Sequence, residues 1–118
     1  MKVLKDPGQV LHIMDEKLDE LRKSRKRFPE LAGKETSEIY GQETAIIHIA
    51  VHIRHTIKGH GCFGVEDMAC VYEYVDGAKE EANKYHRNPR DAWFMKGLAK
   101  GATWVRARID YRMMEGQS

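Results

Sequence analysis

Apolar residues recur every three or four positions along most of the chain, and this spacing is the feature that most constrains the fold. In the segment that begins at Pro7, for example, Val10, Met14, Leu18 and Leu21 fall on one side of a helix. The spacing matches the period of about 3.6 residues of a helix and not the two-residue period of a strand. Prolines and glycines interrupt the pattern between periodic segments. The sequence therefore predicts four helices and no sheet.

Capping residues indicate where these helices begin and end. Asp6 and Asn88 each precede a proline, so each can cap a helix whose first residue is that proline. Thr36 or Ser37 is expected to cap the second helix, and the glycine-rich stretch 59–64 ends it because glycine adopts positive φ angles. With ends accurate to ~2–4 residues, we expect helices at about 7–28, 37–58, 65–86 and 89–114.

The size and composition of the chain suit one domain that spans residues 1–118. Hydrophobic residues make up 42%, enough for one core, and the 32% of charged residues suit the solvated faces of amphipathic helices. Short connections favour antiparallel neighbours. We therefore predict an all-α, compact, four-helix bundle-like single domain. Its predicted core contains Leu18, Leu21, Ile46, Ile53, Val71, Val75, Leu98, Val105 and Ile109.

The second predicted helix carries a stripe of histidines opposite its isoleucines. His48, His52 and His55 share one face because they are spaced at i, i+4 and i+7. Histidines at i and i+4 can both bind a zinc-like ion through neutral imidazole nitrogens, and His60 and Cys62 follow closely. Histidines among small residues can instead hydrogen-bond a facing helix. We favour this structural or interface role and keep a metal site as the alternative.

Two acidic pairs offer another metal-dependent alternative. Glu35 and Glu38 form an E-x-x-E, and Glu73 and Asp76 form an E-x-x-D. All-α nucleotide pyrophosphohydrolases use this carboxylate spacing to hold Mg²⁺. The two pairs are farther apart here than in that family, and Glu73 is expected to project away from the apolar face of its helix. We therefore do not assign the chain to that family, and a metal-dependent hydrolase is the alternative function.

A cluster of cations closes the first helix. Cations at a helix C-terminus complement the helix macrodipole, by ~0.3–1 kcal/mol each. Such a cluster also binds phosphates, although without sequence specificity. The net charge of the whole chain is only +2 and does not by itself indicate a polyanionic partner. Nucleic acid is therefore the second choice of partner, through Arg22, Lys23, Arg25, Lys26 and Arg27.

The fourth helix carries aromatic and basic residues beside its apolar face. Gly97 and Gly101 form a G-x-x-x-G that lets another backbone approach closely. Tryptophans flanked by cations are enriched in protein interfaces. Since one small core can hardly cover both faces of this helix, we expect self-association. The predicted partner-binding stripe consists of Trp93, Lys100, Trp104, Arg108, Tyr111 and Arg112.

The sequence contains no nucleophile elbow, P-loop, dinucleotide fingerprint or C-x-x-C. No stretch approaches the ~20 apolar residues of a membrane span, and the first residues show no secretory signal. We expect a cytoplasmic protein with Cys62 and Cys70 as free thiols. The sequence favours a non-enzymatic helical binding or regulatory protein that needs no cofactor. It is expected to dock as a homodimer on a macromolecule, with a protein partner as the first choice.

Overall fold

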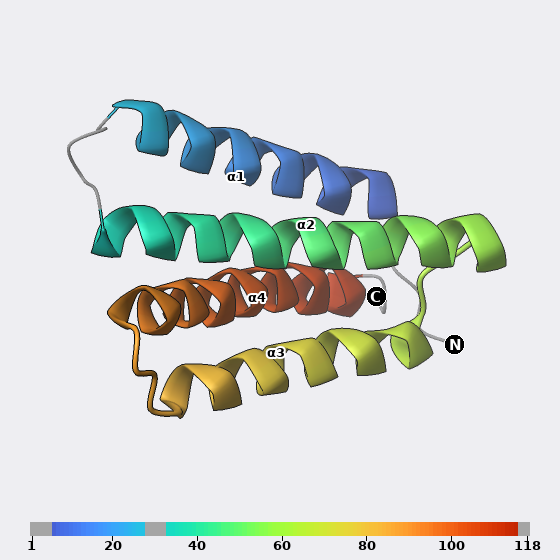
Figure 1. Ribbon diagram of the computed structural model, residues 1–118. Coiled ribbons are helices and arrows are strands. Elements are labelled where there is room, and N and C mark those ends of the chain that lie inside the picture. The colour runs from blue at the N-terminus through green and yellow to red at the C-terminus, as the bar shows by residue number, and fades with distance from the viewer. Residues whose placement is uncertain (1–5, 28–32, 116–118) are drawn as a thin grey trace.

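The computed structural model describes residues 6–27 and 33–115, without the side chains of residues 26, 27 and 111–115. Four helices follow one another along the chain, and a short 3₁₀ turn, η1 (Val65–Asp67), precedes the third. These described residues contain no β-strand, so the all-α prediction is confirmed (Figure 1). The helices are α1 (Pro7–Arg27), α2 (Lys34–His60), α3 (Met68–Asn83) and α4 (Pro89–Glu115).

The starts of α1 and α4 are the ones predicted from the two prolines. A side-chain oxygen of Asp6 accepts a hydrogen bond of 3.0 Å from the backbone N–H of Gln9. At the start of α4, the side-chain oxygen of Asn88 accepts one of 3.0 Å from the backbone N–H of Arg90. Each cap satisfies a backbone donor that has no partner within its own helix.

Three helix ends differ from the predictions: the start of α2 and both ends of α3. α2 begins after Gly33 and not at Thr36 or Ser37, because Gly33 takes a φ of 94° that favours glycine. Its last turn closes at Gly61 with a φ of 79°, as the glycine-rich stretch predicts. α3 is shorter than predicted, since residues 65–67 form η1 and the extended backbone of Lys84 ends the helix.

α2 and α4 form the centre of the molecule and run parallel to each other. A Cβ atom at Gly97 would lie 2.7 Å from the carbonyl carbon of Glu38, and one at Gly101 would lie 2.7 Å from the carbonyl oxygen of Gln42. The two backbones therefore touch at positions where only glycine fits. Because Glu38 meets Gly97 and Gln42 meets Gly101, both helices point in the same direction.

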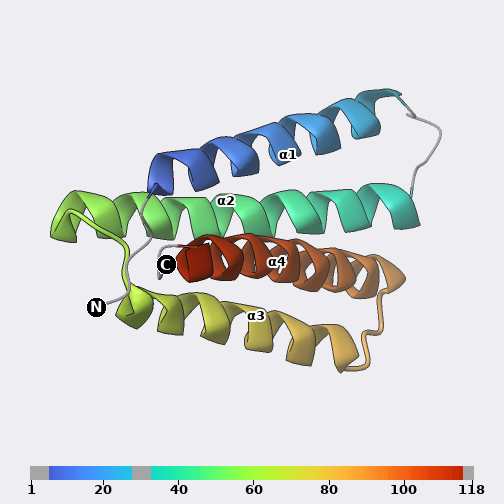
Figure 2. The ribbon, with the colours of Figure 1, turned by 180° about the vertical axis from the view of Figure 1, so that it is seen from behind.

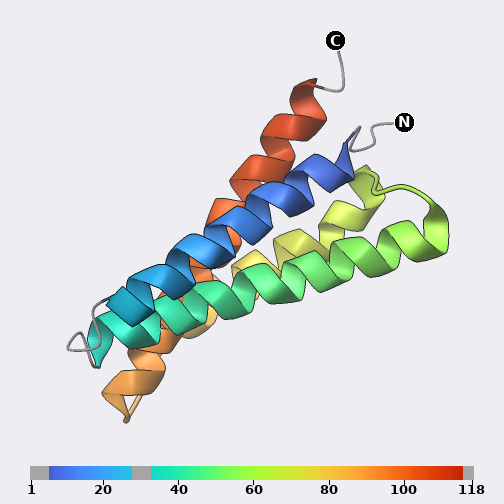
Figure 3. The same ribbon diagram turned by 90° about the horizontal axis from the view of Figure 1, so that it is seen from above.

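α1 and α3 lie on opposite sides of this central pair (Figures 1 and 2). α1 packs antiparallel on α2, and α3 packs antiparallel on α4, so α4 lies between α2 and α3. Viewed from above, α4 is inclined to α2, so the two central helices start close together and splay apart toward the end where α2 and α4 finish (Figure 3). Antiparallel neighbours were predicted throughout, but the most extensive contact joins the parallel helices α2 and α4.

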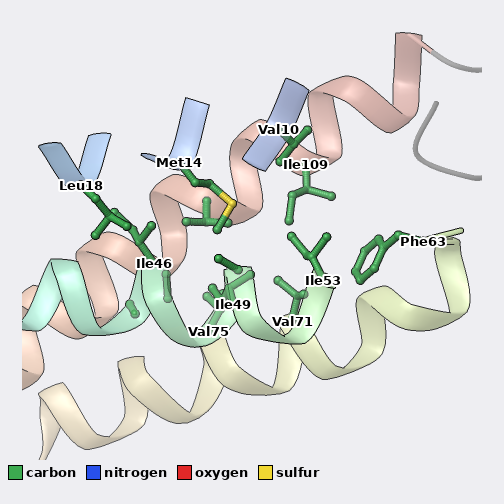
Figure 4. Close-up of a cluster of buried hydrophobic side chains, with 14 of the residues drawn as sticks. Val10, Met14, Leu18, Ile46, Ile49, Ile53, Phe63, Val71, Val75 and Ile109 are labelled. Carbon is green, nitrogen blue, oxygen red and sulfur yellow. The ribbon is translucent and has the colours of Figure 1, made fainter. Parts of the chain in front are cut away.

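The core fills the space between the four helices, and Phe63 packs beside Ile53 at the splayed end (Figure 4). The predicted core residues are buried except Leu98, which is half-buried because it lines a groove between α3 and α4. No helix in the described ranges is long and apolar enough to cross a membrane. The buried apolar side chains are Val10, Met14, Leu18, Leu21, Ala45, Ile46, Ile49, Ala50, Ile53, Phe63, Met68, Val71, Val75, Ala78, Ala102, Val105 and Ile109.

Candidate functional site

Two of the three stripe histidines, the exposed His48 and the half-buried His52, contact the α3 side of the molecule, whereas the exposed His55 does not. Nδ1 of His48 lies 2.9 Å from the hydroxyl oxygen of Tyr74, and the two rings meet edge to face. Nε2 of His52 lies 3.3 Å from the carbonyl oxygen of Asp67. These contacts tie α2 to α3 and η1, which is the structural role that the sequence favoured.

Tyr74 is the α3 partner in the first of these contacts. A tyrosine hydroxyl is protonated at neutral pH, and burial raises the pKa of Tyr74 further, to about 12. The hydroxyl can therefore donate to Nδ1 of His48 when that nitrogen carries no proton. Among the residues that the structure describes, no group of three or more His, Cys, Asp or Glu side chains is arranged to hold a metal ion. The zinc-like site at the histidine stripe stays a prediction.

The four carboxylates of the hydrolase alternative lie on two different helices. Glu35 is exposed in the first turn of α2, and Glu38 is half-buried where α2 meets α4. Glu73 and Asp76 are both exposed on α3, as the helical spacing predicts for Glu73. The hydrolase interpretation therefore stays a prediction that no contact between the two pairs supports.

The basic cluster of α1 is largely engaged within the fold. Nε and Nη2 of Arg25 lie 2.7 and 3.1 Å from the two carboxylate oxygens of Glu43, which is a bidentate pair. Nε of Arg22 lies 3.4 Å from the same carboxylate. The guanidinium of Arg25 also lies 4.4 Å from the ring centroid of Tyr40. The hydrogen bond to Glu43 is the main reason that the pKa of Arg25 is raised.

Of the remaining cations of this cluster, Lys23 is exposed, and the other two have side chains that the structure does not describe. Nζ of Lys23 lies 2.9 Å from Asp19 one turn earlier on α1. The side chains of Lys26 and Arg27 lie outside the described residues. Every described cation of the cluster thus has an acidic partner in the same chain, which favours a structural role over phosphate binding.

The aromatic stripe of α4 is partly covered by the rest of the chain. Trp104 is half-buried against the core, and two cations lie against its ring: Lys17 at 5.6 Å and Arg108 at 4.7 Å from the centroid. Trp93 is half-buried, 3.7 Å from the position of a Cβ atom at Gly33. Lys17 belongs to α1 and Gly33 precedes α2, so both indoles pack within this chain.

The glycine motif of α4 packs within the chain, and the remaining stripe residues are exposed or have side chains outside the described part. The close approach predicted at Gly97 and Gly101 is confirmed, but the backbone that approaches is α2 of the same chain and not a second molecule. Lys100 is exposed, whereas the side chains of Tyr111 and Arg112 lie outside the described residues. Partner binding through this stripe stays a prediction.

The outer face of α2, which we define by Tyr40, Ile47 and Val51, is a second apolar surface that was not predicted from the sequence. These side chains are 47%, 40% and 45% exposed. At roughly 100° per residue they lie within about 40° of one another around the helix. The signal was present in the sequence, since α2 has more apolar residues than its buried stripe at Ile46 and Ile53 uses.

A groove of about 370 Å³ between α3 and α4 was also not predicted. Apolar side chains form its floor and acidic side chains dominate its rim. The groove depends on how α3 leans on α4, so no single segment of sequence signals it. Its lining residues are Glu73, Tyr74, Gly77, Ala78, Glu80, Glu81, Lys84, Met95 and Leu98.

Comparison of the chain with protein-family models, with curated proteins and with solved structures gives no match in any of the three. The candidate binding surfaces of the described chain are the outer face of α2, the stripe of α4 and the groove between α3 and α4.

Proposed function

We propose that the protein is a non-enzymatic helical binding protein that works as a homodimer and docks on a protein partner. The observation that carries this proposal is the outer face of α2. Of the five large hydrophobic side chains exposed in the described part of the chain, three belong to this face. Apolar side chains gathered on one surface mark contacts with other proteins more often than isolated ones do. The free thiols of Cys62 and Cys70 support a reducing, cytoplasmic setting for this binding.

The outer face of α2 fits a second copy of itself in the antiparallel orientation. In a pairing centred midway between positions 47 and 51, Ile47 of one copy lies next to Val51 of the second copy, and Val51 of the first lies next to Ile47 of the second. The same pairing places Lys58 of the second copy near Tyr40, whose ring also lies 4.4 Å from the guanidinium of Arg25 in its own chain. A parallel pairing would instead oppose Lys58 to Lys58. A two-fold symmetric, antiparallel dimer is therefore the arrangement we propose.

Sedimentation equilibrium tests the proposal directly. The wild-type protein should have twice the mass of one 13.6 kDa chain, whereas Ile47→Asp/Val51→Asp should be monomeric with unchanged helical circular dichroism. Val65→Asp is the matched control, because Val65 is 49% exposed but lies on η1. A wild-type protein with the mass of one chain at every concentration contradicts the proposal, as does a double variant that stays dimeric.

A further inference from the structure

The groove between α3 and α4 combines an apolar floor with a rim that carries excess negative charge. Its volume of about 370 Å³ falls in the range of ~300–1,000 Å³ typical of ligand sites. The rim extends along α3 from Glu73 to Glu81, which at a rise of 1.5 Å per residue corresponds to about 12 Å, and Lys84 follows just beyond the end of the helix. The half-buried side chains that form the floor with Ala78 are Tyr74, Met95 and Leu98.

The charges on the rim are not balanced within the groove. Nζ of Lys84 lies 2.6 Å from a carboxylate oxygen of Glu81, and this hydrogen bond lowers the pKa of Glu81. Lys84 thus forms its direct ion pair with Glu81, and its charge also interacts with that of Glu80. Glu73 and Glu80 are exposed and form no ion pair with any described residue. Glu73 and Glu80 therefore stand beside the apolar floor without a direct ion pair, and the rim keeps an excess of negative charge.

We propose that this groove binds an amphipathic helix of a partner protein, with apolar side chains on the floor and lysines or arginines against Glu73 and Glu80. The apolar floor and the length of the rim suit two to three turns of a helix laid in a groove, at a rise of about 5.4 Å per turn. The acidic rim selects a basic helix, because an acidic helix or a nucleic acid would meet like charge.

This inference rests on the proposed function, since it names the chemistry of the protein partner. It uses a different surface, however, because no residue of the outer face of α2 lines the groove. A wild-type dimer whose groove binds nothing would leave the proposed homodimer intact and remove only the groove. A monomeric protein whose groove binds the helix would contradict the proposed homodimer and support the proposed groove. The two proposals therefore fail separately.

A synthetic amphipathic peptide of leucine and lysine is the probe, and the same peptide with glutamate in place of lysine is its control. The ¹³C-methyl signal of Met95 reports the groove, while Met14 and Met68 are fully buried and serve as internal references. We expect the lysine peptide to shift the Met95 signal saturably and the glutamate peptide to leave it unchanged. A lysine peptide that leaves Met95 unshifted overturns the proposal.

Two variants test the rim and the floor. Glu73→Gln/Glu80→Gln should weaken binding of the lysine peptide about three- to tenfold, as expected for two exposed ion pairs. Gly77→Trp should block binding, and it should still fold because no atom lies within 4 Å of a Cβ at this position. The matched control is Glu66→Gln/Asp76→Gln, which removes two exposed carboxylates outside the groove. If this control weakens binding as much as the rim variant, the interaction is general attraction to acidic surface and the groove is not the site.

Discussion

Glu43 is a carboxylate on the inner side of α2, and two arginines of α1 meet its charge. The Glu43 side chain is 7% exposed and that of Arg25 is 21% exposed. Removing either partner of a buried pair leaves a charge with reduced solvation, and the cost is larger for the partner that is less able to reach water. Arg25 can turn toward solvent, whereas Glu43 cannot. The two positions should therefore respond unequally to substitution.

We expect Arg25→Met to lower the free energy of unfolding by ~1–3 kcal/mol, because Glu43 keeps only Arg22 at 3.4 Å. Glu43→Leu should cost less, and Arg25→Met/Glu43→Leu should recover part of the loss, since apolar pairs often replace buried ion pairs without penalty. Urea denaturation of the three variants measures these differences. An Arg25→Met protein as stable as the wild type would show that the ion pair does not stabilise the α1–α2 contact.

Tyr74 gives the fold a dependence on alkaline pH. Its pKa is about 12 in the folded protein against the ordinary 10.0. Between these values the unfolded chain loses the proton first, so the folded state loses stability as the pH rises from 10 to 12. Tyr74→Phe should lose less stability than the wild type over this range. Tyr85→Phe, whose parent ring is 92% exposed, should follow the wild type in the same urea series.

At the scale of elements, the contact between α2 and α4 depends on glycines that no other residue can replace. Overpacking a close contact typically costs ~1–3 kcal/mol, and backbone atoms cannot move aside as a flexible side chain can. We therefore expect Gly97→Ala to lower the free energy of unfolding by at least that amount, given the 2.7 Å approach to Glu38.

Gly77→Ala is the matched control for this substitution. Gly77 also lies within a helix, but nothing lies within 4 Å of its Cβ position. This substitution should stabilise the protein by ~0.5–1 kcal/mol, because alanine loses less conformational entropy in a helix than glycine does. Thermal unfolding of both variants checks the pair of predictions. Equal effects of the two substitutions would contradict the close packing of α2 on α4.

The existence and type of each helix could be predicted from the sequence because the signals are local. Asp6 and Asn88 cap the helices that they precede, and the helical period of apolar residues identified most of the core. The packing partner of each helix could not be predicted, because Gly97 and Gly101 indicate a close backbone contact but not which backbone makes it. Leu98 was predicted to be buried because it lies on the apolar face of its helix. It is only half-buried because the packing of α3 leaves it beside a groove, which the spacing of residues in α4 cannot indicate.

At the scale of the whole molecule, the parallel pair α2 and α4 determines which surfaces are left for partners. α1 and α3 cover opposite sides of this pair, so His48 and His52 of α2 contact α3 and η1, and the indoles of α4 pack within the chain. Two surfaces stay open as a result: the outer face of α2, with its exposed apolar side chains, and the groove beside α3. A dimer that forms through the outer face of α2 uses none of the residues that line the groove.

The antiparallel geometry of the proposed dimer can be tested with disulfides in a Cys62→Ser/Cys70→Ser background, which removes the native thiols. A disulfide forms only when the two Cα atoms lie within ~7 Å. In the antiparallel pair, position 47 faces position 51 of the second copy. The two copies of position 47 are farther apart, because they are offset from each other by about 6 Å along the helix axis as well as being separated by the distance between the helices.

A mixture of Ile47→Cys and Val51→Cys proteins should therefore form the mixed disulfide on mild oxidation, and each protein alone should form little of its own dimer. Mass spectrometry of the non-reduced products distinguishes the species by the masses of the two variants. In a parallel pair equivalent positions face each other, so same-site disulfides would dominate and the antiparallel arrangement would be wrong. If neither kind forms in a protein that sediments as a dimer, the two copies meet through a surface other than the outer face of α2.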